Sequence, residues 1–259
     1  MEIFVHILYN PLFNGLMFLY RYVGDLGVAI ILLTILIKLI LFIPSLSAIR
    51  SQQKMQEIQP KMKELQAKYK DNKEELSRQL MGFYKQHKVN PFSSCLPLLI
   101  QLPILIALYR VFFSGIMVDP ATGIFSADQL SHLYPALRGF FEGLHIDIMF
   151  LNFVNLTAKH NIILAALAAG AQFWQSWMMQ AKRPPKVPGA KDEDTAALVN
   201  RNMMYLLPVM TFIFGYQFPA GLALYWLAST FFQVAQQYYY FKWKHTPLSP
   251  AQPEVLPKQ

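Results

Sequence analysis

The sequence predicts an all-α membrane protein with five transmembrane helices, a cytoplasmic helical hairpin and an N-terminal interfacial helix. Of its 259 residues, 54% are hydrophobic and only 15% are charged, which leaves too few charges to cover a water-facing surface. Five segments approach the roughly 20 apolar residues that a bilayer core requires. The basic residues, which give a net charge of +8, are concentrated in three of the segments outside these spans.

The N-terminal segment, residues 1–26, is the first element. The stretch from Pro11 to Tyr22 is rich in Leu, Phe, Met and Tyr, a composition that suits a helix lying in the membrane interface. A helix packed on the bundle would have the same composition, so both alternatives stay open. Glu2 stands where a signal peptide would carry basic residues, and we therefore expect no cleaved signal.

Five apolar segments follow as candidate transmembrane helices. The predicted spans are residues 27–48, 95–116, 162–180, 203–216 and 219–240. The last two are joined by a short turn at residues 217–219, and the fourth carries Pro208. Three longer connections at 49–94, 117–161 and 181–202 and a tail at 241–259 complete the chain.

The positive charges orient these spans. The 49–94 connection carries ten Lys and Arg residues, whereas the 117–161 connection carries two. The 181–202 connection and the 241–259 tail add eight more. The positive-inside rule places all three basic segments in the cytoplasm, which requires five spans, an outside N-terminus and a cytoplasmic C-terminus. Residues 184–195, with three prolines and Gly189, are expected to form a loop on that side.

The 49–94 connection is predicted to form a helical hairpin. Apolar residues recur three and four positions apart on both sides of residues 70–73. The residues with this spacing are Met55, Ile58, Met62, Leu65, Tyr69, Leu76, Leu80 and Phe83. Pro60 is expected to start or to kink the first arm. The hairpin either serves only to orient the neighbouring spans or also contacts a substrate or partner.

Lys38 lies near the middle of the apolar run 30–43, far from either membrane surface. An ammonium group at that depth costs roughly 2.5–3.5 kcal/mol on insertion scales, so a wet cavity or an anionic partner is expected. No Asp or Glu occurs in any of the five spans. We therefore expect water and amides to solvate the cation, which leaves it available to an incoming acidic group.

Polar side chains in the other spans suit a groove around this charge. They are Gln101, Gln172, Gln175, Ser176, Ser229 and Gln233. Gln172 and Ser176 lie four residues apart, as do Ser229 and Gln233, so each pair shares a helix face. Each alone is also typical of a hydrogen bond between helices. Together with Lys38 they favour a polar groove.

The sequence contains none of the common nucleotide-binding or catalytic motifs. There is no GxxxxGK[ST], HExxH or GxSxG, and the spans contain no carboxylate for a proton relay, so neither an enzymatic activity nor a cofactor is expected. The single cysteine, Cys95, and the six histidines show no metal-ligand spacing. Basic charge next to aromatic residues does not indicate nucleic-acid binding here, because the positive-inside rule already explains it.

Three stretches of the sequence resemble a known family. They are QEIQPKMKELQAKYKDNKEELSRQLMGFYKQHKVNP at 56–91, CLPLLIQLPILIALYRVF at 95–112 and FPAGLALYWLASTFFQVAQQ at 218–237. In this combination and order the chain resembles the YidC-type membrane protein insertases, which have relatives in mitochondria and chloroplasts. The resemblance covers about residues 10–242. It implies a five-helix core whose groove opens to the cytoplasm and the lipid and is closed to the outside.

The resemblance also implies a function, a location and partners. Members of this family insert small membrane proteins alone and assist the Sec translocase with larger ones. The expected substrates are nascent membrane proteins, the expected surroundings are the lipids of the bacterial inner membrane, and the ribosome and a targeting receptor are candidate partners. We expect a minimal core form, because the sequence shows neither the large extracytoplasmic domain nor the N-terminal lipoprotein cysteine of many bacterial members.

The family's groove centres on a positive residue of the first span, most often arginine, and Lys38 occupies that position. Lysine keeps the charge but lacks the planar fork of arginine. By motif position, Gln172 or Gln175, together with Trp226, correspond to the family residues near this charge.

Two other functions would use the same residues. A small-solute or anion channel could use Lys38 as its selectivity charge, but the apolar outer half of the first span, residues 28–33, disfavours a polar pore. A structural chaperone or subunit of a larger translocase is the other alternative, and it could operate alongside insertion.

Overall fold

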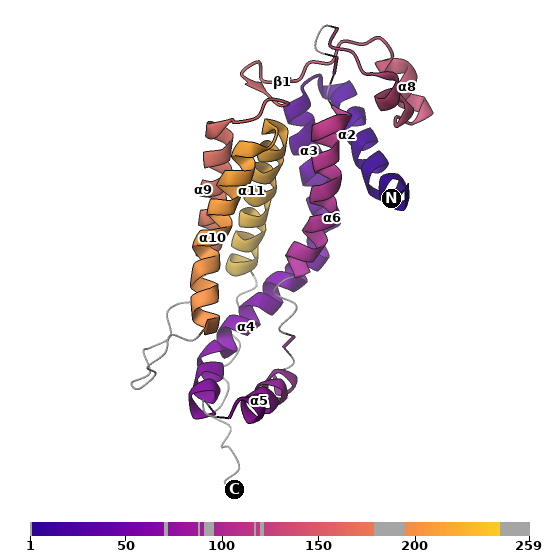
Figure 1. Ribbon diagram of the computed structural model, residues 1–259. Helices are drawn as coiled ribbons and strands as arrows, with labels where there is room; N and C mark the ends of the chain where they lie inside the picture. The colour runs from indigo at the N-terminus through magenta and orange to yellow at the C-terminus, as the bar shows by residue number, and fades with distance from the viewer. Residues whose placement is uncertain are drawn as a thin grey trace.

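The computed structural model describes residues 2–69, 72–87, 89–90, 96–116, 118–119, 122–178 and 195–243. These residues are mostly helical, so the helical class predicted from the sequence is confirmed (Figure 1). Cys95, most of the expected loop at 184–195 and the end of the tail lie outside the described residues.

The N-terminal segment is helical and packs on the bundle. Its elements are α1 (Glu2–Phe4), a π-helical stretch η1 (Val5–Tyr9) and α2 (Asn10–Val23). Gly24 ends α2 in the left-handed conformation, with φ 74°, which glycine adopts without steric cost. α2 packs against the next helix and buries Phe13, Leu16 and Met17 completely. One face of this segment is therefore packed on the body, while Ile7, Phe18 and Tyr22 on the rest of its surface are exposed.

Five longer helices form the body of the molecule. They are α3 (Leu26–Ile40), α6 (Leu96–Arg110) with the π-helical stretch η3 (Val111–Gly115) after it, α9 (Ile162–Met178), α10 (Thr195–Gln217) and α11 (Ala220–Trp243). α9, α10 and α11 pack on one another, α11 also packs on α3, and α6 lies on the other side with η1 and α2 (Figure 1). α10 begins well before residue 203, the expected start, because Thr195–Leu198 contains two alanines and a leucine that continue the helix.

The range predicted as the first span is divided in two. α3 ends at Ile40, α4 (Phe42–Lys68) begins after Leu41, and the two helices meet at 67°. Pro44 favours a break at this point, because proline has no N–H to donate to the carbonyl of Ile40 and is best accommodated in the first turn of a helix.

Judged by length and apolar composition, no single helix of the described residues suffices to cross a membrane. The bent pair of α3 and the first part of α4, Phe42–Met55, meets both criteria together.

The rest of α4 and α5 (Lys73–Gln86) form a hairpin that extends away from the body (Figure 1). Its apolar seam consists of the buried Ile58, Met62 and Val89, with Met55, Leu80, Phe83 and Tyr84 packed against them. Five of the eight residues selected from the sequence pattern lie in this seam. Pro60 lies inside α4 and does not start it.

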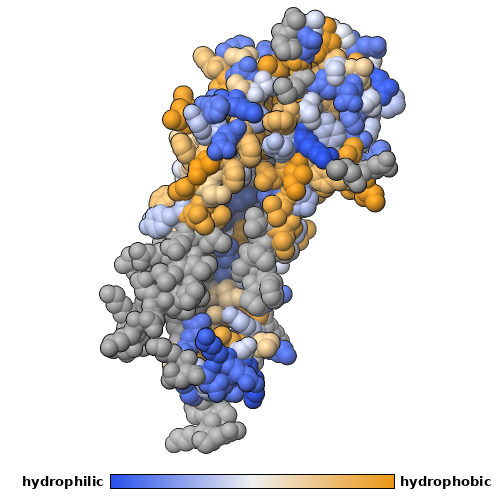
Figure 2. All heavy atoms as spheres, viewed as in Figure 1, coloured by the Kyte–Doolittle hydropathy of each residue, from blue (hydrophilic) through white to orange (hydrophobic). Residues whose placement is uncertain are grey.

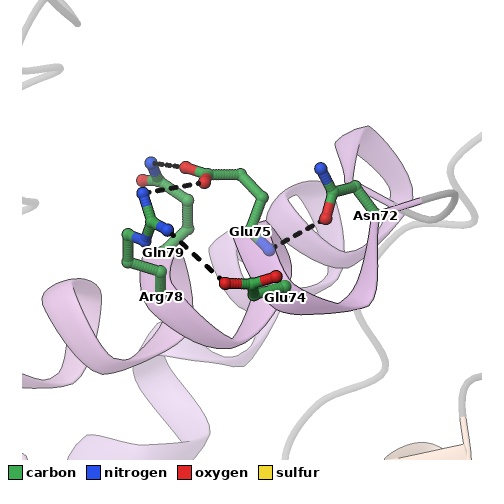
Figure 3. A network of polar contacts seen from close by, with 5 residues as sticks. All are labelled: Asn72, Glu74, Glu75, Arg78 and Gln79. Atoms are coloured by element: carbon green, nitrogen blue, oxygen red, sulfur yellow. Dashed lines mark hydrogen bonds and ion pairs between the residues drawn. The ribbon is translucent and has the colours of Figure 1, made fainter.

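The start of α5 is held by a network of exposed polar contacts (Figure 3). The side chain of Asn72 caps the helix by accepting a hydrogen bond of 3.0 Å from the backbone N–H of Glu75. Gln79 Nε2 donates to Glu75 at 2.8 Å, and Arg78 forms ion pairs with Glu75 at 3.4 Å and with Glu74 at 3.8 Å. Acidic residues in the first turn also suit the positive end of the helix dipole.

The opposite end of the molecule is covered by the 117–161 connection. It contains α7 (Ala127–Ser131), α8 (Pro135–Phe141) and an antiparallel strand pair, β1 (Met149–Phe150) and β2 (Val154–Asn155). The turn between α10 and α11 hydrogen-bonds to this segment, since Gly221 N donates to Leu156 O at 2.8 Å and Ala220 N to Ala158 O at 2.9 Å. Leu156 is fully buried, so this end of the body is closed by packed apolar residues.

Candidate functional site

Lys38 lies in the last turn of α3, close to the bend at Leu41. It is buried, with 8% of the residue exposed. One turn earlier, the buried Thr34 donates its hydroxyl proton to the carbonyl of Ile30 at 2.7 Å. The charge of Lys38 is therefore held inside the body by a helix whose other inward residues are apolar or internally satisfied.

A chain of hydrogen bonds leads from Lys38 across two other helices. Lys38 Nζ donates to Oε1 of Gln101 in α6 at 3.1 Å. The Nε2 group of Gln101 in turn donates to the hydroxyl of Tyr225 in α11. Tyr225 is almost fully buried, and Ser229, which is also buried, lies one turn further along the same face of α11. Lys38 and Gln101 were both predicted site residues, and the structure joins them to Tyr225.

The charge of Lys38 is not neutralised by any acid of the described residues. The sequences of α3, α6, α9, α10 and α11 contain no Asp or Glu, and no ion pair of Lys38 exists within the described part of the chain. Its partner Gln101 supplies a carbonyl dipole but no negative charge. A buried ammonium with only a dipole as its partner keeps its attraction for an anion, because the missing counter-charge is not supplied internally.

The remaining predicted site residues are distributed over α9 and α11. Gln175 in α9 donates to Gln233 in α11 at 2.5 Å, so this pair links the two helices. Gln172 and Ser176 are half-buried on α9, and within the described residues no hydrogen bond joins them to Lys38. Trp226 stacks with Phe214 in α10, with ring centroids 6.5 Å apart and planes 7° apart. The structure therefore places Trp226 against α10, while Tyr225 beside it reaches Gln101.

The hairpin end of α11 carries two further buried amides. Gln236 accepts a hydrogen bond from the Ser45 hydroxyl at 2.8 Å and donates to the carbonyl of Phe42 at 3.1 Å. It thereby ties α11 to the first turn of α4, directly after the bend. The neighbouring Gln237 is equally buried, and its Oε1 atom accepts no hydrogen bond from the described residues.

Polar side chains thus follow α11 from Tyr225 to Gln237, a distance of about 18 Å at 1.5 Å per residue. Figure 2 shows a recess on one face of the molecule, between the block of α9, α10 and α11 and the side of α6. Hydrophilic surface lies at the bottom of this recess and hydrophobic surface on both of its flanks. The arrangement is that of a polar groove with apolar walls.

Comparison with known proteins identifies the family. The sequence profile described as "60Kd inner membrane protein" matches residues 18–247. The membrane protein insertase YidC of Fusobacterium nucleatum subsp. nucleatum is 35% identical over 239 residues, which are 91% of this chain and 97% of that protein. The chain belongs to the YidC family of membrane protein insertases. The resemblance inferred from the sequence is therefore confirmed.

Other YidC relatives are longer. The membrane protein insertase YidC of Saccharophagus degradans is 34% identical over 236 residues, which cover 91% of this chain but 35% of that protein. A crystal structure of an active YidC insertase with its first transmembrane domain resolved matches with a TM-score of 0.55 and 26% identity, over 89% of this chain and 46% of that one. The chain thus spans nearly all of one relative and between a third and a half of the others.

Sequence reasoning missed Tyr225 and Gln236. A tyrosine in an apolar helix is more often a packing residue, and neither side chain has a charge that would single it out. A signal for Tyr225 was present, because it lies four residues before Ser229 and so shares its helix face. Gln236 carries a comparable signal, because it lies three residues after Gln233, but its partners Ser45 and Phe42 follow a bend that the apolar run does not reveal.

Proposed function

We propose that this chain inserts membrane proteins into the inner membrane of a bacterium. In this proposal the bent pair of α3 and α4, together with α6, α9, α10 and α11, makes five spans, with the N-terminus outside and the C-terminus in the cytoplasm. The support is the family, whose members are named insertases, and the asymmetry of positive charge between the connecting segments.

The observation that carries the proposal is the neutral partner of the buried Lys38. Gln101 holds Nζ in place at 3.1 Å without neutralising it. A carboxylate adds the attraction of opposite charges to the hydrogen bond, which the neutral amide oxygen cannot supply, so a substrate carboxylate outcompetes Gln101 for Lys38. The groove therefore binds acidic groups reversibly, which transient capture of a passing segment requires.

Insertion by this route is a physical process and needs no covalent step, cofactor or nucleotide. In this proposal, water that enters the groove beside Lys38 shortens the apolar distance that a hydrophilic tail must cross. Acidic residues of the tail are attracted to Lys38, and the apolar segment that follows leaves sideways into lipid. The driving force is about 25 cal/mol for each Å² of apolar surface removed from water.

The hairpin of α4 and α5 is proposed to meet the substrate first. Its exposed basic residues face the cytoplasm in the proposed topology; they are Lys54, Lys61, Lys68, Lys73, Arg78 and Lys85. Cooperation with the Sec translocase on larger substrates, and contact with the ribosome or a targeting receptor, are further proposals that rest on the family resemblance.

The experiment is insertion by the purified protein in liposomes, with two single-span substrates that differ only in whether the translocated tail is acidic or neutral. Lys38→Arg should retain insertion of the acidic-tail substrate, because arginine keeps the charge and can form two hydrogen bonds to a carboxylate. Lys38→Ala should impair it and Lys38→Glu should impair it most. The neutral-tail substrate should change less in all three variants.

Lys159→Ala is the matched control, because Lys159 is an exposed lysine at the opposite end of the body from the hairpin. Equal insertion of the acidic substrate by the wild type and by the alanine and glutamate variants would refute the electrostatic role of Lys38. Insertion by the wild type without other components separates an autonomous insertase from an accessory subunit of a translocase.

A further inference from the structure

We infer that Tyr225 is a positioning residue for Lys38, acting through the amide of Gln101, and that it thereby contributes to the preference for acidic tails. The inference deepens the proposed function and rests on it. Two hydrogen bonds carry it: Lys38 to Gln101, and Gln101 to Tyr225.

The two ends of a glutamine amide are not equivalent toward an ammonium group. The oxygen accepts a hydrogen bond, whereas the NH₂ group only donates. With Oε1 facing Lys38 the contact is favourable. If the amide turned by half a rotation, two donors would face each other and Lys38 would lose its acceptor. Lys38 can only donate and so requires Oε1, and the hydroxyl of Tyr225, which accepts from the Nε2 end, anchors the amide from the opposite side.

Tyr225 can fix this orientation because it is the less mobile partner. Its residue is 1% exposed, and its ring belongs to the apolar core of the body. Gln101 is only half-buried, and its longer side chain has more rotatable bonds. The packed Tyr225 of α11 therefore restricts the position of the Gln101 side chain.

Loss of the Tyr225 hydroxyl should release Lys38 without changing its charge. A lysine freed from its partner extends its four-carbon stem and moves its ammonium group toward water. The charge would remain in the groove but would no longer be fixed at the junction of α3, α6 and α11. Acidic tails should then lose their advantage over neutral tails.

The test compares Tyr225→Phe, Gln101→Ala and the double variant with the wild type, in liposomes and with the acidic-tail and neutral-tail substrates. Tyr20→Phe is the matched control, because Tyr20 is also buried and its hydroxyl also accepts a hydrogen bond, from Asp147 N at 2.9 Å, at the far end of the body. We expect Tyr225→Phe to lower the ratio of acidic to neutral insertion about fivefold, the effect of one hydrogen bond of ordinary strength. Tyr20→Phe should leave the ratio unchanged.

A second measurement does not depend on insertion. The rate at which a water-soluble amine-acylating reagent modifies Lys38 is followed by mass spectrometry of the reconstituted protein across a range of pH. Tyr225→Phe and Gln101→Ala should both accelerate this modification, because each frees the ammonium group to reach water. A role of Tyr225 in packing alone would not produce this acceleration, since phenylalanine preserves the ring.

The outcomes separate the inference from the proposed function. If the wild type shows no preference for acidic tails, the proposed electrostatic function fails, and the acylation rates still decide whether Tyr225 positions Lys38. If the preference exists but Tyr225→Phe retains both the wild-type ratio and the wild-type acylation rate, the inference is overturned. A further loss on adding Tyr225→Phe to Gln101→Ala would also overturn it, because Tyr225 would then act independently of Gln101.

Discussion

Two adjacent glutamines near the end of α11 should respond oppositely to the same substitution. Gln236 and Gln237 are each 4% exposed, so leucine at either position removes an amide of the same size from the same depth. Gln236 makes two hydrogen bonds to the first turn of α4, whereas Oε1 of Gln237 accepts none from the described residues. The comparison therefore separates the effect of hydrogen bonding from that of burial.

The magnitudes follow from these contacts. Gln236→Leu removes bonds of 2.8 Å and 3.1 Å, and at about 0.5–1.5 kcal/mol each the loss is about 1–3 kcal/mol of unfolding free energy. Hydrogen bonds inside membrane proteins average about 0.6 kcal/mol, which favours the lower end of that range. Gln237→Leu removes a buried acceptor that has no donor, so it should leave stability unchanged or raise it by about 1 kcal/mol.

The two variants should also differ in the orientation of the hairpin. Gln236 joins α11 to α4 directly after the bend, through Phe42 and Ser45. Without it, the angle between α3 and α4 is held by fewer contacts, and the hairpin should sample a wider range of positions. Electron paramagnetic resonance distances between spin labels at the exposed positions Met81 and Leu167, in a Cys95→Ser background, would measure this range.

The distance distribution should broaden for Gln236→Leu and stay like that of the wild type for Gln237→Leu. Unfolding in mixed micelles, followed by tryptophan fluorescence, gives the stability of both variants. Equal destabilisation by the two substitutions, or a distribution that Gln236→Leu leaves unchanged, would refute the reasoning.

Two further predictions concern stability away from the groove. Gly27→Ala should destabilise the protein by about 1–3 kcal/mol, as overpacking does, because a Cβ atom there would lie 2.1 Å from Phe150 Cδ2. The melting temperature of this variant tests the prediction. Gly82→Ala is the control, because nothing lies within 4 Å of a Cβ atom at that position. Asn72→Ala should cost the hairpin about 0.5–2 kcal/mol through loss of the cap on α5, whereas Arg78→Ala should cost less than about 0.5 kcal/mol, because its ion pairs are exposed. Hydrogen exchange of the α5 amides measures both effects, and equal protection in the two variants would contradict the prediction.

Five of the seven residues in the seam of the hairpin could be predicted from their spacing. Met55, Ile58 and Met62 follow one another at three- and four-residue spacings, and helix geometry alone places them on one face. Leu80 and Phe83 obey the same rule on the second arm. A seam between two neighbouring helices needs only local periodicity and a turn, so the sequence contains the necessary information.

The bend after α3 could not be predicted from hydropathy. The apolar run continues from Ile30 to Ile43, so it has the appearance of one uninterrupted span. Pro44 is the only local signal, and a proline at that position is equally compatible with a kink inside a continuous helix. The 67° angle also depends on the tertiary contact between α11 and the first turn of α4, in which Gln236 bonds to the carbonyl of Phe42.

The residues of the candidate site were easier to predict than the hydrogen bonds between them. A lysine in an apolar helix is conspicuous in the sequence because its burial is costly, and glutamines in apolar helices are conspicuous to a lesser degree. Which glutamine meets Lys38 depends on the relative rotation of α3 and α6, and no periodicity encodes it. The resemblance pointed to Gln172 or Gln175, whereas the structure pairs Lys38 with Gln101.

α11 is a single helix that is linked to Lys38, through Gln101, and to α4, the helix that continues into the hairpin. Tyr225 and Gln236 lie eleven residues apart, so along a helix they are separated by about 16 Å; Tyr225 reaches Gln101 in α6, and Gln236 reaches Phe42 and Ser45 in α4. A movement of α11 by one helical turn relative to α6 and α4 would break both sets of contacts together. Gln233, by contrast, bonds to Gln175 in α9. A substrate that separates α9 from α11 would therefore break that amide pair and leave the position of Lys38 and the angle of the hairpin unchanged.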